Sequence, residues 1–249
     1  MAEFKVLDVP LCNVTIDDIV RGRVAARFIV PVNVDVLMKT QNDSCFIEAL
    51  RRYVNSILFV PDSQVLIAAI RLIFGFKFTS RVSGSDLLPV ICKRFDQAQG
   101  GIFFLGGTNG AADAAKDRIN KEVNRDVVVG AYSPSWGFEL IPEECKSIVK
   151  MINDSGATIV AVGVGAPKQE LWMLQHAEKM PGVKTFIAVG ATIDFLAGKV
   201  RRAPAWVSNA GLEWLFRLIQ EPKRLAKRYL LDDLPFFWLL LKQKYGLHK

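Results

Sequence analysis

The sequence predicts an α/β fold over most of the chain and a helical, basic segment at its end. Short runs rich in Val, Ile and Phe recur along the first 195 residues, and stretches with the periodicity of amphipathic helices separate them. The runs are continuously apolar rather than alternating, which is typical of strands covered by helices on both faces of a parallel sheet. The charge is uneven: residues 199–249 hold 11 Lys and Arg against 4 Asp and Glu, which accounts for the whole net charge of +7.

The apolar runs define the strands, and the intervening periodic stretches define the helices. Strands are expected at residues 27–34, 56–62, 101–107, 126–132, 157–165 and 185–194. Helices are expected at 110–123 and at 142–156. In the second of these, Pro142 lies near the start and Gly156 just past the end, as helix ends favour. The apolar stretch 64–78 is interpreted as a buried helix, with a lipid contact as the alternative.

The chain is therefore expected to divide into an α/β domain at 1–195, a doubly wound parallel sheet of the Rossmann-like class, and a helical basic appendage at 196–249. A basic, aromatic-rich segment binds an anionic partner such as nucleic acid, a phospholipid surface or a phosphorylated substrate. The stretch LPFFWLLLKQKYG at 234–246 is too short to span a bilayer and suits interfacial insertion. Packing back onto the α/β domain is the alternative.

The composition excludes several chemistries. Four scattered cysteines without a C-x-x-C pair argue against a zinc ribbon or a disulfide framework, and they fit a reducing cytoplasm. With only His176 and His248, a multi-histidine metal site is impossible, and His176 is interpreted as structural. No two aspartates are separated by a single residue, so the Asp-x-Asp pair with which many nucleotide-sugar transferases hold a divalent metal is absent. These two kinds of metal site are therefore excluded, and no cofactor is expected.

Ligands of open α/β sheets bind at the carboxyl ends of the strands. The strand at 157–165 runs into GVGAPK, a Gly-x-Gly-x-Pro turn that leads into a helix. Lys168 stands where the dinucleotide-binding fingerprint G-x-G-x-x-G needs a third glycine, and the Walker pattern fails as well. Free N–H groups at such a helix start, together with the helix dipole, attract phosphate oxygens. Pro167 is expected at the first helical position, and Lys168 is expected to add positive charge to the turn. The turn is interpreted as a phosphate site, with a tight turn that holds no ligand as the alternative, and FLGGTNGAAD at 104–113 offers a second turn of this kind.

Three longer segments carry a family resemblance. They are GVGAPKQELWM from Gly163, GATIDFLAGKVRRAPAWV from Gly190 and GLEWLFRLIQEPKRLAKRYL from Gly211. In this order and spacing they resemble the WecG/TagA/CpsF glycosyltransferases, glycosyltransferase family 26, over about residues 33–231. RVSGSDLL at 81–88 is similar to the family's Arg-x-x-Gly-x-Asp-Leu segment, and FVPDS is similar to its strand that ends in an aspartate.

The resemblance implies an inverting enzyme, thought to need no metal, that moves a sugar from a UDP-sugar to a polyprenyl-diphosphate-linked saccharide. Such enzymes are peripheral proteins at the cytoplasmic face of the bacterial inner membrane. Their products feed teichoic acids, enterobacterial common antigen, capsules and exopolysaccharides. The opening residues lack the pattern of a signal peptide, which agrees with a cytoplasmic face. Nucleic acid is not an expected partner, and the donor sugar stays open between N-acetylmannosamine, its uronic acid and glucose.

Asp62 matches the family's catalytic aspartate and is assigned as the general base that takes the acceptor proton, with a helix cap as the alternative. Substrate-binding roles are assigned to Asn33, Arg81, Asp86, Gly106, Gly107, Tyr132, Gly165, Gln169, Glu170 and Asp194. Turn stabilisation, internal ion pairing and simple packing are the alternatives for the polar and aromatic members. Family members often have Asp-Gly-x-Gly where this chain continues Ser63-Gln64-Val65, and Pro31 replaces a threonine of the teichoic-acid members. These departures leave the sugar specificity open.

Three arginines of the appendage follow at spacings of seven and four residues: Arg217, Arg224 and Arg228. These spacings place them on roughly one face of a helix, which Pro222 is expected to interrupt. They are interpreted as the groups that hold a diphosphate, of UDP or of the lipid carrier, beside an anionic membrane surface. A solvated basic face is the alternative. Two other classes of protein stay open: a basic-tailed α/β protein that binds nucleic acid, and an NAD-type oxidoreductase, which the failed fingerprint disfavours.

Overall fold

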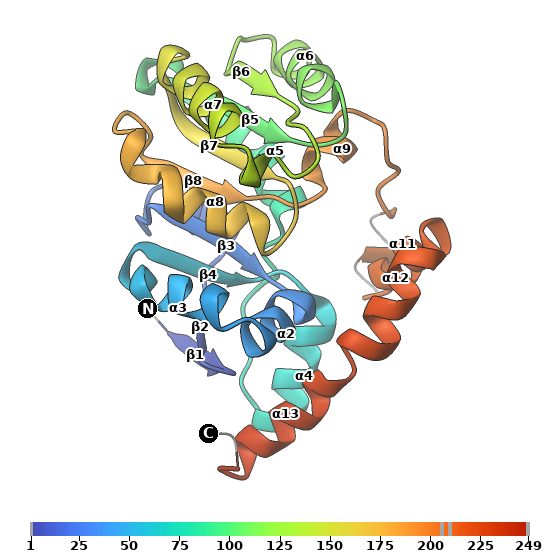
Figure 1. Ribbon diagram of the computed structural model, residues 1–249. Helices are drawn as coiled ribbons and strands as arrows, with labels where there is room; N and C mark the ends of the chain where they lie inside the picture. Colours follow the sequence, from blue (N-terminus) through green and yellow to red (C-terminus); the bar gives the residue numbers. More distant parts are fainter. Residues whose placement is uncertain (1, 205–206, 209–210, 248–249) are drawn as a thin grey trace.

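The computed structural model describes residues 2–204, 207–208 and 211–247, without the side chains of Arg224 and Leu230. Its centre is an eight-stranded sheet in the order β1-β2-β4-β3-β8-β7-β5-β6 (Figure 1). The strands are β1 (Glu3–Val6), β2 (Val9–Cys12), β3 (Phe28–Val32), β4 (Ile57–Pro61), β5 (Gly101–Gly106), β6 (Val128–Tyr132), β7 (Ala157–Gly163) and β8 (Thr185–Ala188). Neighbouring strands are parallel except β1 and β2, which form an antiparallel hairpin at one edge.

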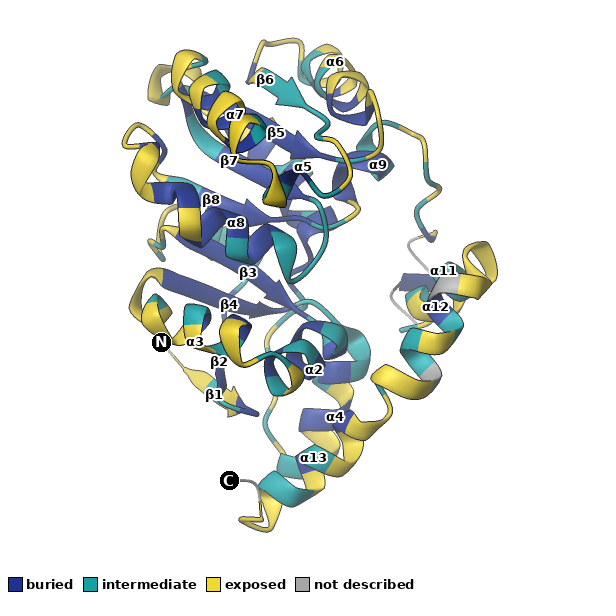
Figure 2. Ribbon diagram, viewed as in Figure 1, coloured by how far each residue is buried: buried dark blue, intermediate teal, exposed yellow. Residues whose placement is uncertain are grey.

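Helices cover both faces of this sheet. Those of the α/β domain are α1 (Ile16–Val20), α2 (Val34–Asn42), α3 (Ser44–Arg52), α4 (Gln64–Phe74), α5 (Gly84–Arg94), α6 (Ala111–Val123), α7 (Pro142–Asp154), α8 (Lys168–His176) and α9 (Thr192–Leu196). The buried side chains of α2, α3, α7 and α8 join one core cluster with one face of the sheet, whereas those of α5, α6 and α9 join a second cluster on the other face. The strands lie between the two layers, and all except the edge strands β1 and β6 are dark along most of their length in the burial view (Figure 2). The predicted doubly wound α/β class is therefore confirmed.

Most of the predicted elements are present, and the errors lie at their ends. All six predicted strands form, but the last prediction is wrong beyond Ala188, because Thr192 already begins α9. The apolar pattern continues across this boundary since Ile193, a helical residue, is fully buried. The helix predicted at 64–78 ends at Phe74, and its burial holds for one face only, because Leu72 is 86% exposed. The β1–β2 hairpin was not predicted.

Within the described residues 211–247, the chain forms three helices that run along one side of the molecule (Figure 1). They are α11 (Glu213–Gln220), α12 (Pro222–Lys227) and α13 (Pro235–Lys244), with a π-helical turn at Arg228–Asp232 between the last two. Pro222 separates α11 from α12, as expected, and it lies in the first turn of α12, where its missing N–H costs no hydrogen bond.

Helix α13 packs back onto the α/β domain through one of its faces. It lies against α2 and α4, and Phe236 and Leu240 are fully buried in the larger core cluster. The side chain of Gln243 donates to the carbonyl of Lys5 at 2.8 Å and accepts from the N–H of Leu7 at 2.9 Å, so the β1–β2 turn is tied to the helix. The opposite face stays open, since Phe237 and Trp238 are 41% and 61% exposed. Packing back onto the α/β domain, which was the alternative, is thus present for one face of α13, and interfacial insertion of the open face stays a prediction.

Candidate functional site

Asp62 lies where β4 ends, at the carboxyl edge of the sheet. Its backbone N–H donates to the carbonyl of Val32 at 2.8 Å, which places it beside the end of β3. The cap of the following helix is Ser63, whose Oγ accepts from the N–H of Leu66 at 3.3 Å. Asp62 therefore does not cap α4, and within the described residues no side chain donates a hydrogen bond to its carboxylate.

The electrostatic surroundings of Asp62 suit a general base. Burial raises the pKa of its carboxyl from 3.8 to about 7, while the nearby charges of Arg217 and Arg81 lower it and those of Glu213 and Asp86 raise it again. Because a base is most effective when its pKa lies near the working pH, a carboxyl that titrates near 7 is matched to proton removal from a hydroxyl. Arg217 and Glu213 belong to the appendage, so the appendage forms part of this site.

Arg81 and Asp86 are engaged with each other and with the appendage. Arg81 donates from Nη2 to Oδ2 of Asp86 and from Nη1 to Oε2 of Glu213, both at 2.8 Å. Asp86 also accepts from Oγ of Ser83 at 2.6 Å and from Arg202. Burial alone would raise the pKa of Asp86, but the hydrogen bonds from Arg202 and Ser83 hold it below its usual value. The contacts of this pair are those of an internal brace, which was the alternative to a substrate-binding role.

Close packing against β8 explains why the RVSGSDLL segment has a glycine, Gly84, at its centre. A Cβ at this position would lie 2.9 Å from the backbone Cα of Val189, at the end of β8, and backbone cannot move aside cheaply. The absence of a side chain lets the start of α5 approach the sheet closely. Arg81 and Asp86, which flank this point, are thereby held at the carboxyl edge.

The turn after β5 is held by Asp194. Thr108 donates to Oδ1 of Asp194 from both its backbone N–H and its Oγ1, each at 2.8 Å. Gly106 has a φ of +133°, and a Cβ there would lie 2.3 Å from the carbonyl oxygen of Gly163. Gly107, with a φ of +73°, donates its N–H to the same oxygen at 3.0 Å. The turns after β5 and β7 are therefore packed backbone to backbone, and Asp194 has a structural partner there.

Tyr132, at the end of the edge strand β6, is tied to the loop that follows it. Its hydroxyl donates to Oε1 of Glu144 at 3.2 Å. The same carboxylate accepts from the N–H of Ser135 at 2.8 Å and from its Oγ at 2.5 Å. Burial and the charge of Glu144 raise the pKa of the Tyr132 hydroxyl, so it stays protonated at neutral pH. The ring is held at the same edge of the sheet as Asp62, but β6 lies five positions away from β4 in the strand order.

Gln169 joins two of the loops at the carboxyl edge. Its Oε1 accepts from the N–H of Gly165 at 3.3 Å and from the N–H of Gly190 at 3.1 Å, and its Nε2 donates to Oε1 of Glu170 at 2.8 Å. Gln169 is 5% exposed and Glu170 is fully buried. Burial raises the pKa of Glu170 to about 7, against the hydrogen bond from Gln169 that lowers it. This amide therefore fixes loops rather than facing solvent.

The start of α8 differs from the expected phosphate turn in two details. Pro167 precedes the helix as its cap rather than occupying its first position. Lys168, expected to add positive charge to the turn, forms an ion pair with Glu139 at 2.5 Å and lies 4.8 Å from the centre of the Trp136 ring. Gly165 has a φ of +85°, a backbone conformation that favours glycine, and open space where a Cβ would stand.

Asn33 caps α2, since its Oδ1 accepts from the N–H of Val36 at 3.0 Å. The first turn of that helix carries Asp35, which pairs with Lys39 at 2.8 Å and with Nε of Arg228 at 3.3 Å. Lys39 in turn donates to the carbonyl of Ala166 at 2.8 Å. Asn33 thus has the turn-stabilising contact that was its alternative, and an appendage arginine lies beside the same helix start.

Arg217 and Arg228 of the appendage do not lie on one continuous helix. Arg217 lies on α11, whereas Arg228 lies on the π-helical turn beyond α12, and the side chain of Arg224 is outside the described part. The single-face expectation is wrong for Arg217 and Arg228, because Pro222 and the π-helical turn interrupt the regular helix between them. Arg217 still lies at the carboxyl edge, with its guanidinium 5.1 Å from the ring of Phe195 and its charge acting on Asp62.

Glu213 and Arg202 are site residues that the sequence did not single out. The spacing of four between Glu213 and Arg217 is a signal for a pair on one helix face, and they do pair at 3.1 Å. The contact of Glu213 with Arg81 spans 132 residues and left no trace in the sequence.

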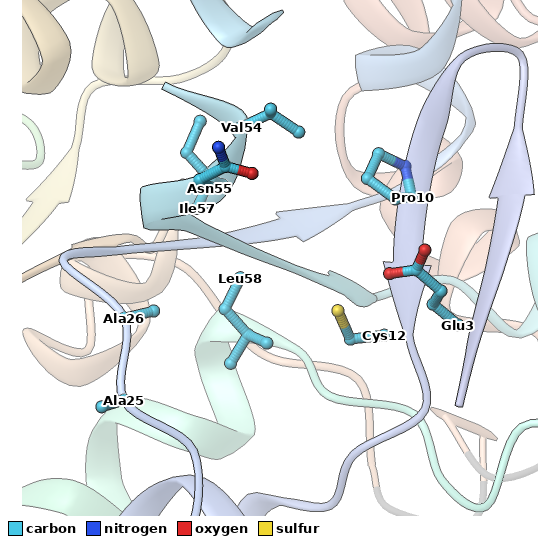
Figure 3. Close-up of a pocket in the computed structure, with 9 residues that line it drawn as sticks. All are labelled: Glu3, Pro10, Cys12, Ala25, Ala26, Val54, Asn55, Ile57 and Leu58. Carbon is cyan, nitrogen blue, oxygen red and sulfur yellow. The ribbon is translucent and has the colours of Figure 1, made fainter. Parts of the chain in front are cut away.

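A hollow of about 310 Å³ lies elsewhere (Figure 3). Residues that precede β3 and β4 line it, among them Ala26 and Asn55, together with Cys12. It contains none of the predicted site residues, and its position before the first residues of β3 and β4 puts it at the opposite edge from Asp62. This hollow therefore does not belong to the candidate site.

No group of three or more His, Cys, Asp or Glu side chains is placed to hold a metal ion in the described ranges. Nor does that part of the chain contain a helix with the length and apolar character that a bilayer crossing requires.

The chain matches the family model described as the glycosyl transferase WecG/TagA/CpsF family over residues 4–249, nearly its whole length. The match includes every site residue described above, and it extends the resemblance of the sequence motifs to the β1–β2 hairpin and to α13. Members transfer a sugar from a donor to an acceptor in the synthesis of cell-surface polysaccharides. The chain therefore belongs to the WecG/TagA/CpsF glycosyltransferase family.

Proposed function

We propose that the protein transfers a sugar from a UDP-sugar to a polyprenyl-diphosphate-linked saccharide, with inversion and without a metal, and that Asp62 is its general base. The observation that carries this proposal is the carboxyl of Asp62. It lies at the carboxyl edge of the sheet with no hydrogen-bond donor among the described side chains, its pKa is raised to about 7, and Arg217 and Arg81 lie close enough to act on it.

The proposed transfer is a single displacement at the anomeric carbon. The carboxylate of Asp62 takes the proton of the acceptor hydroxyl while that oxygen forms a bond to the anomeric carbon. The bond from this carbon to the β-phosphate oxygen breaks on the opposite face, and UDP leaves with its electron pair. Positive groups fixed in advance stabilise the charge that develops on the diphosphate. We assign this role to Arg217, Arg224 and Arg228.

The donor lies along the turns of the carboxyl edge. We assign the diphosphate to the glycine turns at Gly106–Gly107 and Gly165, and the uridine to the end of β6 with Tyr132. Asp194 contributes Oδ2 to the uridine, because Thr108 occupies its Oδ1. Asn33 directs the Nδ2 end of its amide to sugar hydroxyls, since Oδ1 is taken by the helix cap. Gln169 and Glu170 support the phosphate turn from within.

The membrane contact falls to the open face of the appendage, at the cytoplasmic side of the bacterial inner membrane. Trp238, Tyr245 and Leu247 are between 61% and 71% exposed, and the Lys242 ammonium lies 5.6 Å from the centre of the Trp238 ring. Aromatic residues beside lysine are typical of segments at the boundary between headgroups and acyl chains. Helix α4, which α13 contacts, carries a further exposed apolar side chain, Leu72.

The experiment is a UDP-release assay with purified protein, a panel of UDP-sugars and EDTA, with and without a short-chain polyprenyl-diphosphate saccharide. We expect release with one donor, only when the acceptor is present, and with no loss in EDTA. Donor turnover that disappears in EDTA would contradict metal independence. If every UDP-sugar stays inert beside the lipid acceptor, the proposed donor and acceptor are wrong.

A further inference from the structure

Glu213 is a partly buried carboxylate of the appendage that uses both of its oxygens. Oε2 accepts from Nη1 of Arg81 at 2.8 Å and from Oγ of Ser208 at 3.2 Å, and Oε1 accepts from Nη2 of Arg217 at 3.1 Å. The side chains of Glu213 and Arg81 are only 15% and 13% exposed. With its oxygens occupied in this way, Glu213 is not a base for the acceptor.

Glu213 stays ionised across the working pH range. Burial on its own would raise the pKa of this carboxyl, but the hydrogen bond from Arg81 and the charges of Arg217 and Arg81 hold it below its usual value. A partly buried carboxylate shared by two guanidinium groups is a strong link, because its bonds are charge-assisted and its removal would leave the guanidinium of Arg81, which is only 13% exposed, without this partner.

The two partners of Glu213 belong to different parts of the molecule. Arg81 lies in the loop before α5 and is fixed there by Asp86, whereas Arg217 lies one helical turn after Glu213 on α11. A second link joins the same regions, because Arg202 pairs with Asp86 and donates to the carbonyl of Ser85 at 3.2 Å. The segment that leads into α11 is thus held against the start of α5 at two points.

We propose that Glu213 is a positioning residue that docks α11 on the α/β domain through Arg81 and so sets the guanidinium of Arg217 beside Asp62. This inference rests on the proposed function, since it explains how Arg217, the cation assigned to stabilise the departing UDP, is held near Asp62. Glu213 touches neither substrate nor the reacting atoms. Glu213 acts only through Arg217. Removing Glu213 should therefore cost most of the activity that Arg217 contributes.

A double-mutant cycle tests this coupling. Glu213→Gln keeps the size of the side chain but removes its charge, so Arg217 loses its anchor, and kcat/KM for transfer should fall about 10- to 100-fold, as misplacement of a catalytic group does. In an Arg217→Ala background, the same change should cost less than about threefold, because residues that act as a unit are non-additive. The control is Asp232→Asn, which removes an exposed carboxylate of the appendage and should stay within about threefold of the parent.

Amide hydrogen exchange tests the docking without any substrate. Exchange over residues 213–220 should rise in Glu213→Gln, while that of β5 and β7 stays as in the wild type. If exchange also rises in β5 and β7, the variant Glu213→Asp is used in place of Glu213→Gln. The shorter acid keeps the charge but is too short to contact Arg81. Multiplicative effects in the cycle, or unchanged exchange of α11, would overturn the inference. Because the exchange arm needs no turnover, it still decides on the docking if no UDP-sugar is transferred and the proposed function fails.

Discussion

Asp62→Asn should abolish most of the transfer while leaving the fold intact. Asparagine has nearly the same shape but cannot take a proton, and the loss of a general base lowers rates by about 10²- to 10⁴-fold. We expect kcat with the lipid acceptor to fall by a factor in this range. Binding of UDP, followed by calorimetry, should change little, because the nucleotide is assigned to other strand ends.

The stability of this variant separates lost chemistry from lost structure. The pKa of Asp62 is about 7 in the folded protein against an ordinary value of 3.8, so the protonated form is favoured by folding. That contribution is fully present below the ordinary pKa, and it is lost as the pH rises through the folded pKa. At pH 8 the wild type carries a partly buried charge that Asn lacks, and the melting temperature of Asp62→Asn should equal or exceed that of the wild type. A variant that is inactive and also melts well below the wild type would instead point to a structural role.

Phe236→Ala should cause the largest loss of stability among single changes in the appendage. Phe236 is fully buried in the larger core cluster, where α13 lies against α2 and α4. Truncation of a buried phenylalanine removes the transfer free energy of its ring and leaves a cavity, and it costs about 3–5 kcal/mol. We expect the urea midpoint to fall accordingly. Because one helix can open locally, the truncation can instead detach α13 alone. In that case global stability falls less, and α13 is cleaved selectively by a protease.

The neighbouring residue provides a matched control. Phe237 has the same side chain, one position later on the same helix, but is 41% exposed. Phe237→Ala should change the unfolding free energy by at most about 1 kcal/mol. Equal effects at the two positions would show that α13 is not packed through the face that carries Phe236. The Phe237 variant should instead weaken sedimentation with anionic vesicles, since its ring lies on the open face.

The strands of the sheet were predictable because their cause is local. Buried parallel strands need apolar residues at every position, and β3, β4, β5 and β7 show that pattern in the chain itself. The β1–β2 hairpin lacks a usual signal, since its turn is made by Leu7 and Asp8 with positive φ rather than by glycine or asparagine.

The site could be predicted as a set of strand ends, but not as a network. Asp62 follows from its place after β4, and its helix-cap alternative fails only because Ser63 takes that role, which depends on side-chain geometry. Gln169 has the polarity of a sugar-binding residue, yet its contacts with Gly165 and Gly190 depend on how two loops meet in space. The pairing of Arg81 with Glu213 is further out of reach, because a tertiary contact between distant residues has no periodicity to reveal it.

The dependence of kcat/KM on pH tests most directly whether Asp62 is the base, because this parameter reports the essential groups of the free enzyme. With the base protonated at low pH, kcat/KM of the wild type should rise about tenfold per pH unit up to a pKa near 7 and then level off. The residual activity of Asp62→Asn should lack this rise. A wild-type profile that is flat between pH 5 and 8, or a rise near 7 that persists in Asp62→Asn, would show that the proton is taken by another group.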